Sequence, residues 1–222
     1  MVFGSVMQMN VGELTVELAP ITRDDVPRLI DGGFWHHTTT QYLPVDTAFT
    51  LEDEYEWYEK TRQNQQAITW GIFVVKNGER RLIGNTSLMD IHDRPVAVAT
   101  TGIVLTDRAY WGKGIASATH KARTWYAFRQ RGLIALNSRV LSPNRASQRA
   151  IESVGYVYSY TSRNEKFVNG GLIHAYHYQL VNPDEWAWSQ WWGDDQPSAE
   201  ASAARQKTQQ ILSWADNNVE LK

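Results

Sequence analysis

Two glycines flank a single lysine where a predicted helix begins, in the stretch "DRAYWGKGIASATHKARTWYAFRQRG" (residues 107–132). The first turn of a helix leaves backbone N–H groups without partners, and the helix dipole favours an anion there. Gly112 and Gly114 would let the backbone approach a ligand closely, and Lys113 adds a positive charge. From these residues alone, a phosphate site and an ordinary turn are equally good interpretations.

Two nucleotide-binding motifs do not fit this loop. A Walker A loop requires GxxxxGK[ST], and no stretch of the chain matches it. The segment "GKGIAS" begins like GxGxxG but ends in Ser117, and the next predicted strand, "LIALNSRVL", carries no acidic residue that would bind a ribose. The loop therefore does not predict a dinucleotide-binding domain.

A second segment, "SPNRASQRAIESVGY", also places polar side chains where a helix begins. Asn144 is a good N-cap residue, and Ser147 lies one helical turn further along, so both side chains can face the same ligand. Gly155 is expected to end this helix in the left-handed conformation that glycine adopts easily.

The elements that must position these residues are a mixture of strands and helices. Apolar alternation and turn signals predict strands at 13–19, 68–76, 81–91, 96–105, 133–141, 156–163 and 171–181. Helices are predicted after Thr22, over 50–63, after the glycine loop, over 144–155 and in the tail beyond Val181. Asn77-Gly78 and Asn169-Gly170 predict tight hairpin turns. This order favours an α+β sheet over a regular βαβ repeat.

The composition narrows the classes of function. The chain has 222 residues, 42% of them hydrophobic, which suits one domain or one domain with an appendage. A net charge of −2 does not indicate a nucleic-acid surface or a polybasic membrane patch, and no apolar run approaches the roughly 20 residues that span a bilayer. The absence of cysteine excludes disulfides, thiolate nucleophiles and cysteine-ligated zinc. With an N-terminus unlike a signal peptide, this composition fits a cytoplasmic protein.

No metal site is expected. His174 and His177 are three residues apart in a predicted strand, so their side chains point to opposite faces of the sheet. His36 and His37 lie in a predicted loop without other ligand types nearby in the sequence.

Together, in this order and spacing, "YWGKGIA" and the pattern NxxSxxAIxxxGY resemble the GNAT superfamily of acyl-CoA-dependent N-acyltransferases. The chain is most similar to the branch that contains the RimJ/RimL ribosomal-protein N-terminal acetyltransferases. The likeness extends from about Glu13 to Trp186. It implies a mixed, mostly antiparallel central sheet that is splayed between its fourth and fifth strands and flanked by helices.

The resemblance also implies where acetyl-CoA binds. In the family, backbone amides of the glycine loop bind the pyrophosphate, the pantetheine arm lies along the edge of the preceding strand, and an asparagine bonds that arm. The matching loop residues are Trp111, Gly112, Lys113, Gly114, Ile115 and Ala116. The matching edge is 102–105, with Ile103, Val104 and Leu105, and the matching asparagine is Asn144. Relatives usually have Arg or Gln at the position of Trp111, and Lys113 is expected to replace that contact.

The catalytic positions depart from the commonest family pattern. Many relatives carry a tyrosine seven residues after the asparagine and a glutamate in the strand before the loop, where this chain has Ile151 and Thr100. The RimJ/RimL branch implies Ser147 as the group that stabilises or protonates the thiolate. His174 stands where that branch often has an aspartate, and it is the predicted base. The alternatives are a locally bonded helix serine and a strand histidine that packs or faces solvent.

The acceptor side is less well defined. Helix 50–63 carries five carboxylates among aromatic residues, which suits a cationic amine, but a solvated acidic helix face is the more ordinary interpretation. Trp35, Tyr42 and Trp70 are candidates for the groove or for the core. Five tryptophans in the tail are expected to pack it onto the domain or a second subunit: Trp186, Trp188, Trp191, Trp192 and Trp214.

We therefore predict an enzyme that transfers an acetyl group from acetyl-CoA to a primary amine, by direct attack in a ternary complex. The acceptor is a protein N-terminus or a small molecule such as a polyamine or aminoglycoside. A non-catalytic acyl-CoA-binding regulatory module is the alternative. Residues 1–186 are predicted as the GNAT domain and 187–222 as a Trp-rich helical extension, with a homodimer as one option for assembly.

Overall fold

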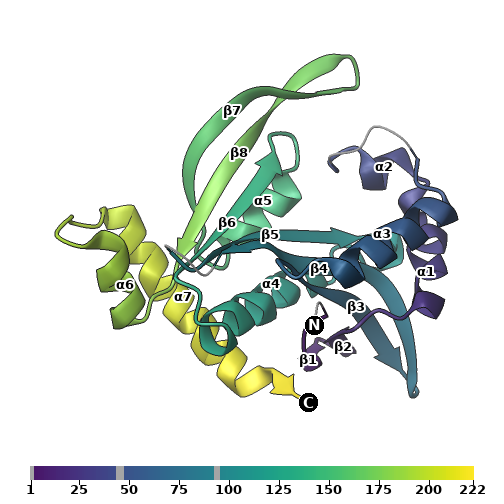
Figure 1. Cartoon of the computed structure of the whole chain (residues 1–222), viewed down its shortest axis with the longest axis horizontal. Helices are drawn as coiled ribbons and strands as arrows, with labels where there is room; N and C mark the ends of the chain where they lie inside the picture. Colours follow the sequence, from purple (N-terminus) through teal and green to yellow (C-terminus); the bar gives the residue numbers. More distant parts are fainter. Residues whose placement is uncertain (1–2, 44–47, 93–95) are drawn as a thin grey trace. The chain divides into compact units, whose positions relative to one another are not determined.

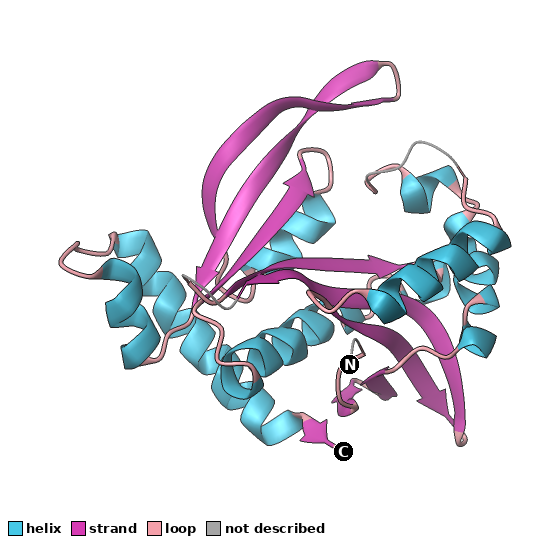
Figure 2. Cartoon of the chain, in the orientation of Figure 1, coloured by secondary structure: helices cyan, strands magenta, loops and turns pink. Residues whose placement is uncertain are grey.

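The computed structural model describes residues 3–43, 48–92 and 96–222 (Figure 1). Within these residues, nine strands form one open sheet in the order β7-β8-β6-β5-β4-β3-β2-β1-β9. Figure 2 colours the strands magenta and the helices cyan. The strands are β1 (Met7–Val11), β2 (Leu14–Ala19), β3 (Ile68–Lys76), β4 (Glu79–His92), β5 (Val98–Leu105), β6 (Ala135–Leu141), β7 (Val157–Val168), β8 (Gly171–Val181) and β9 (Glu220–Leu221).

Among the strand pairs whose register is described, β5 and β6 run parallel and the others are antiparallel. The α-helices are α1 (Pro27–Leu29), α2 (His37–Thr40), α3 (Leu51–Gln63), α4 (Ile115–Trp125), α5 (Arg145–Glu152), α6 (Glu185–Trp192) and α7 (Ala199–Asn218). The predicted fold, a mixed and mostly antiparallel sheet flanked by helices, is confirmed.

Local signals in the sequence set several of these boundaries. The Thr50 hydroxyl accepts the Asp53 N–H at 3.2 Å and the Asp53 carboxylate accepts the Thr50 N–H at 2.8 Å, a capping box that starts α3. At the β3–β4 turn, Asn77 and Gly78 have φ values of 53° and 81°. The positive φ that such two-residue turns require explains why asparagine and glycine stand there.

The sequence analysis missed two strands, β1 and β9. The alternation in β1 is present, because Met7 and Met9 are buried while Gln8 and Asn10 are not. The segment lies outside the family resemblance and contains two methionines, which are not strong strand formers, so its period was overlooked. The two residues of β9 pair with Met7 and Gln8, a contact that nothing local in the sequence could indicate.

The chain divides into two compact units, and each is described on its own. Unit 1 comprises Met1–Met89, Gly102–Thr119 and Asn218–Lys222, and unit 2 comprises Asp90–Thr101 and His120–Asn217. The core of unit 1 joins β2, β3 and β4 to α1 and α3 through residues such as Ala19, Leu29, Tyr58, Phe73 and Leu82.

Unit 2 encloses a chain of polar groups. The Arg123 guanidinium is fully buried and bonds His120 Nδ1 at 2.8 Å and the Tyr156 hydroxyl. Tyr156 bonds Thr101 Oγ1 at 3.1 Å, and Thr101 Oγ1 donates to the Asn137 carbonyl at 3.1 Å. Burial, and then the Arg123 charge, hold the pKa of His120 well below its usual value, so the ring is neutral and can accept from the guanidinium.

Tyr156→Phe is expected to lower the free energy of unfolding by about 2 kcal/mol, because it removes an acceptor from a buried charged group. Urea denaturation measures this loss. Tyr160→Phe is the matched control, since Tyr160 is 56% exposed and its change should cost less than about 0.5 kcal/mol. Equal stability of the two variants would show that the buried hydroxyl contributes nothing.

The tail packs against the rest of unit 2. A Cβ at Gly155 would lie 2.3 Å from Thr208 Oγ1 and 3.0 Å from the Ala204 carbonyl, so α7 sits directly on this glycine. The Trp125 indole N–H donates to Asp216 at 2.6 Å. Trp188, Trp191 and Trp192 line a cavity of about 170 Å³ with residues of β7, β8 and α7. The predicted domain boundary after Trp186 stays a prediction.

Candidate active site

The glycine loop lies in unit 1 between a short 3₁₀ turn, Arg108–Tyr110, and α4. Gly112 and Gly114 have φ values of +73° and +80°, which side-chain-bearing residues adopt only with strain. Residues 111–114 are all exposed, and the Lys113 ammonium lies 5.2 Å from the Tyr110 ring centroid. Both glycines are therefore required by the backbone itself.

The loop presents a row of backbone donors. Within the described chain, the N–H groups of residues 112–117 donate no hydrogen bond, and the first helical bond of α4 runs from Ala118 N–H to the Gly114 carbonyl at 3.0 Å. Six consecutive free N–H groups with a lysine among them, at the positive end of a helix, form a site for an anion. Trp111 is not part of this row, because its N–H donates to the Arg108 carbonyl.

Side chains of unit 1 hold the loop in place. The Asp107 carboxylate accepts the Ala109 N–H at 3.0 Å and two Arg81 donors at 3.1 and 2.9 Å. The Trp111 indole N–H donates to the Leu105 carbonyl at 3.0 Å. The tryptophan at this position thus ties the loop to the end of β5, which is a structural role that the sequence did not reveal.

The strand before the loop loses its parallel partner halfway. The register of β5 with β6 covers Val98–Thr101 and stops before Ile103, Val104 and Leu105, which are half-buried. On its other side β5 packs tightly against β4, since a Cβ at Gly84 would lie 2.1 Å from the Val104 carbonyl. The fourth and fifth strands predicted from the sequence are β5 and β6. Their predicted divergence corresponds to the point at which the β5–β6 pairing ends.

The second predicted segment belongs to unit 2 and begins α5. Asn144 Oδ1 accepts the Ser147 N–H at 3.1 Å, which confirms asparagine as the N-cap. Among the described residues, the Asn144 amide N–H groups and the Ser147 hydroxyl make no hydrogen bond, although both residues are half-buried. The local bond considered for the Ser147 hydroxyl is therefore not made. Ile151 is 1% exposed and belongs to the core.

His174, also in unit 2, is held by three bonds. Its backbone N–H donates to Ser142 Oγ at 3.2 Å, its carbonyl accepts the Ser142 N–H, and its ring Nδ1 accepts the Asn164 N–H at 3.1 Å. The proton is therefore on Nε2, and His174 can act as a base only by giving up the bond to Asn164. The role of His174 as a base stays a prediction, and it would require the loss of the hydrogen bond from the Asn164 N–H.

The three aromatic candidates for the acceptor groove differ in burial. Trp70 is fully buried and its indole donates to the Ser5 carbonyl, so it belongs to the core, whereas Trp35 is 63% exposed and Tyr42 half-buried. The His177 ring stacks on Tyr160 at 4.1 Å. In the described part of the chain, no group of three or more His, Asp or Glu side chains is arranged to hold a metal ion.

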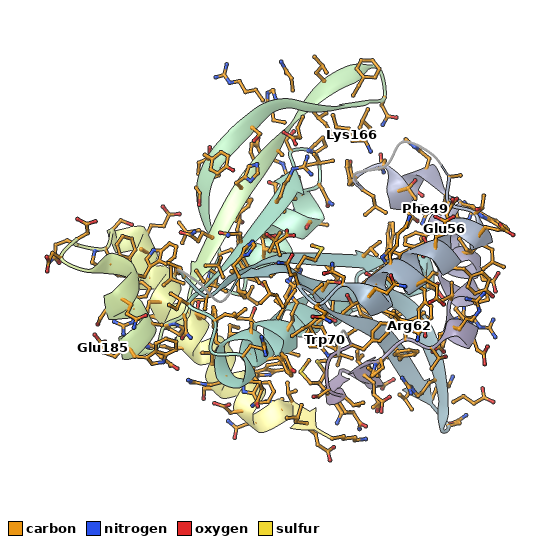
Figure 3. All side chains as sticks on the ribbon, in the orientation of Figure 1. Phe49, Glu56, Arg62, Trp70, Lys166 and Glu185 are labelled. Atoms are coloured by element: carbon orange, nitrogen blue, oxygen red, sulfur yellow. The ribbon has the colours of Figure 1, made fainter. Side chains whose placement is uncertain are left out.

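Most carboxylates of α3 have ordinary surface roles. Glu56, labelled in Figure 3, pairs with Lys60 at 3.1 Å, and Glu59 pairs with Arg23 and with the labelled Arg62. Asp53 caps the helix. For these residues the solvated-face interpretation is confirmed.

Glu54 is different, and the sequence analysis did not single it out. It is 3% exposed and lies on the buried face of α3 with Tyr58, four residues later. Burial, with a smaller contribution from the Asp53 charge, raises the pKa of Glu54 to about 7. A helical projection with Leu51, Glu54 and Tyr58 on one face would have given the signal.

The raised pKa predicts how stability depends on pH. The folded protein binds more protons than the unfolded chain between about pH 4.5 and pH 7, so this group makes stability fall as pH rises through that range. Glu54→Gln is therefore expected to be about 2 kcal/mol more stable than the parent at pH 8, with a smaller difference at pH 5. Urea titrations at both pH values measure this, with the exposed Glu56→Gln as control. A gain equal at both pH values would contradict the raised pKa.

The sequence matches a known protein family and a bacterial relative. Residues 15–157 match the family described as acetyltransferase (GNAT) domain. A probable N-acetyltransferase of Bacillus subtilis, YjcK, is 28% identical over 146 residues, which cover 64% of this chain and 79% of that protein.

Two solved structures share the fold. Spermidine N-acetyltransferase from Vibrio cholerae, in complex with CoA and spermine, superposes with a TM-score of 0.65 at 20% identity, covering 76% of this chain and 95% of that one. The ribosomal-protein-S5-alanine acetyltransferase from Vibrio fischeri has a TM-score of 0.64 at 20% identity, covering 81% and 98%.

No helix in the described residues is both long and apolar enough to cross a bilayer. The family match covers more than half of the chain and includes the glycine loop, Asn144 and Ser147. The chain therefore belongs to the GNAT acetyltransferase family and is an enzyme of the acyltransferase class.

Proposed function

We propose that this enzyme transfers the acetyl group of acetyl-CoA to a primary amine by direct attack in a ternary complex. The observation that carries the proposal is the row of N–H groups from Gly112 to Ser117 at the start of α4, which suits the pyrophosphate of CoA. Lys113 adds charge beside that row.

Other predicted residues take roles along the rest of the cofactor. The edge of β5 at Ile103, Val104 and Leu105 would bind the pantetheine arm through its backbone, and the Asn144 amide would donate to a carbonyl of that arm. The Ser147 hydroxyl would stabilise the thiolate as the C–S bond breaks. The half-buried, unbonded state of Asn144 and Ser147 supports these roles, because each side chain keeps donors for a ligand.

The acceptor is a primary amine of one of two kinds. A protein N-terminus follows from the resemblance to the RimJ/RimL branch, and the structural likeness to a ribosomal-protein-S5-alanine acetyltransferase supports it. A small polyamine is the second kind, supported by the likeness to a spermidine N-acetyltransferase.

An acceptor screen tests the function. The enzyme is incubated with acetyl-CoA and, separately, with spermidine, an aminoglycoside and a peptide that begins with alanine, and products are detected by mass. We expect one amine class to gain an acetyl group in an enzyme-dependent manner. Acetyl-CoA binding without acetylation of any of these classes would contradict the proposal.

A further inference from the structure

Glu54 combines a buried position with a carboxylate that stays reachable. The residue is 3% exposed, yet neither of its oxygens is among the fully enclosed polar atoms that lack a hydrogen bond, and the carboxylate has no bonding partner in the described chain. The carboxylate is therefore the part of Glu54 that still contacts solvent, while the body of the side chain is covered.

The buried face of α3, on which Glu54 lies, packs into the core of unit 1. Tyr58, on the same face of α3, belongs to the core cluster of unit 1, and Val104 of β5 packs against that cluster, as do Tyr55 and Trp57 of α3. The buried face of α3 and the strand proposed to hold the pantetheine arm are thus parts of one packed body.

In the described part of the chain, no ion pair joins Glu54 to a positive charge. The charged groups on the elements around this cluster are paired elsewhere: Arg23 with Glu59, Arg28 with Asp31, Arg80 with Glu17 and Arg81 with Asp107. On its own helix, the Asp53 charge opposes ionisation of Glu54 further. A buried carboxylate without a cation is costly, so the site is prepared for a group that brings a positive charge or a proton.

We propose that Glu54 accepts the proton of the acceptor's ammonium group before acetyl transfer, an inference that rests on the proposed function. The proton moves from R–NH₃⁺ to the carboxylate, and the neutral nitrogen attacks the acetyl carbonyl carbon. The C–S bond breaks, the CoA thiolate leaves, and the new amide nitrogen loses its second proton to water. The carboxylic acid then returns its proton to solvent.

The proton affinity of this carboxylate suits the task. An α-amino group has a pKa near 8 and an alkylamine near 10, so transfer to an ordinary glutamate with a pKa of about 4.3 is unfavourable by roughly 4–6 units. Burial raises the pKa of Glu54 to about 7, which reduces this gap to roughly 1–3 units. At pH 8 most of the enzyme still holds Glu54 ionised and ready to accept.

Thiol release across pH 5.5 to 9 tests the inference, using whichever of spermidine or the alanine peptide reacts faster. The parent's kcat/KM is expected to rise on a limb near pH 7. Glu54→Gln should lose this limb and at least tenfold of kcat/KM at pH 8, with unchanged acetyl-CoA affinity by calorimetry. Glu54→Asp, which keeps a carboxylate, should retain the limb at a lower rate, and Glu56→Gln should match the parent.

Each contrary result has a distinct meaning. A parent that releases thiol with an amine, and a Glu54→Gln protein that keeps the limb and the rate, would overturn the role of Glu54 while the proposed function stands. If the rise of kcat/KM near pH 7 is lost in His174→Gln and kept in Glu54→Gln, the role of Glu54 is also overturned, and His174 is the group that accepts the proton. Failure of the parent to release thiol with any amine would overturn both proposals.

Discussion

Replacing Gly114 by valine is expected to weaken acetyl-CoA binding at least 100-fold. The φ of Gly114 is +80°, where a β-branched residue is strained, so the loop must shift and its row of N–H groups loses its alignment. The new side chain would also occupy the space through which a phosphate approaches the backbone. Calorimetric titration with acetyl-CoA measures the loss.

Gly78→Val separates strain from binding. Gly78 has a φ of +81°, nearly the same as Gly114, and stands in the exposed β3–β4 turn with no atom within 4 Å of a new Cβ. It should lose stability as Gly114→Val does and keep its affinity for acetyl-CoA. A folded Gly114→Val protein with the parent's affinity would remove the glycine loop from the cofactor site.

Ser147→Ala is expected to lower kcat about 100-fold while changing the KM for acetyl-CoA much less. A hydroxyl that stabilises the thiolate acts on charge that develops only in the transition state, so its loss appears in kcat. Removing one such donor typically costs about 10² in rate. Steady-state kinetics with the amine found in the screen provide both parameters.

Ser153→Ala is the matched control on the same helix. The Ser153 hydroxyl donates to the Ala150 carbonyl at 2.6 Å at the far end of α5, so its loss should leave kcat unchanged. Turnover of Ser147→Ala at the parent's rate would reduce Ser147 to a helix residue and leave the thiolate without a side-chain donor.

Sequence patterns predicted those features whose causes are local. The Thr50 cap, the Asn77-Gly78 turn and the Asn144 cap each depend on residues within a few positions of one another. Gly112 and Gly114 were predicted to let the backbone approach a ligand closely, but their positive φ values are a property of this loop that the sequence did not indicate.

Features that depend on distant packing were not predictable. The partner of the Trp111 indole is the Leu105 carbonyl, a contact set by how the loop folds back on β5. The contact of α7 with Gly155 joins residues about fifty positions apart. A helical projection places Glu54 on the face of Leu51 and Tyr58, but how far that face is buried depends on the packing of α3.

The family resemblance predicted where His174 lies in the fold, but it did not predict the hydrogen bonds of its ring. The residue lies in β8 as predicted, but the bond from Asn164 N–H to its Nδ1 arises from a register shift in β7 opposite that strand. The tautomer it imposes determines what the ring can accept, and no spacing in the sequence indicates it.

Release of CoA thiol from acetyl-CoA by the purified enzyme, with and without a primary amine, shows whether the protein is a catalyst. We expect slow release from acetyl-CoA alone, a large increase on adding the correct amine, and loss of that increase in Gly114→Val. Tight binding of acetyl-CoA with no amine-dependent release of thiol would contradict the proposed function and favour a protein that binds the cofactor without using it.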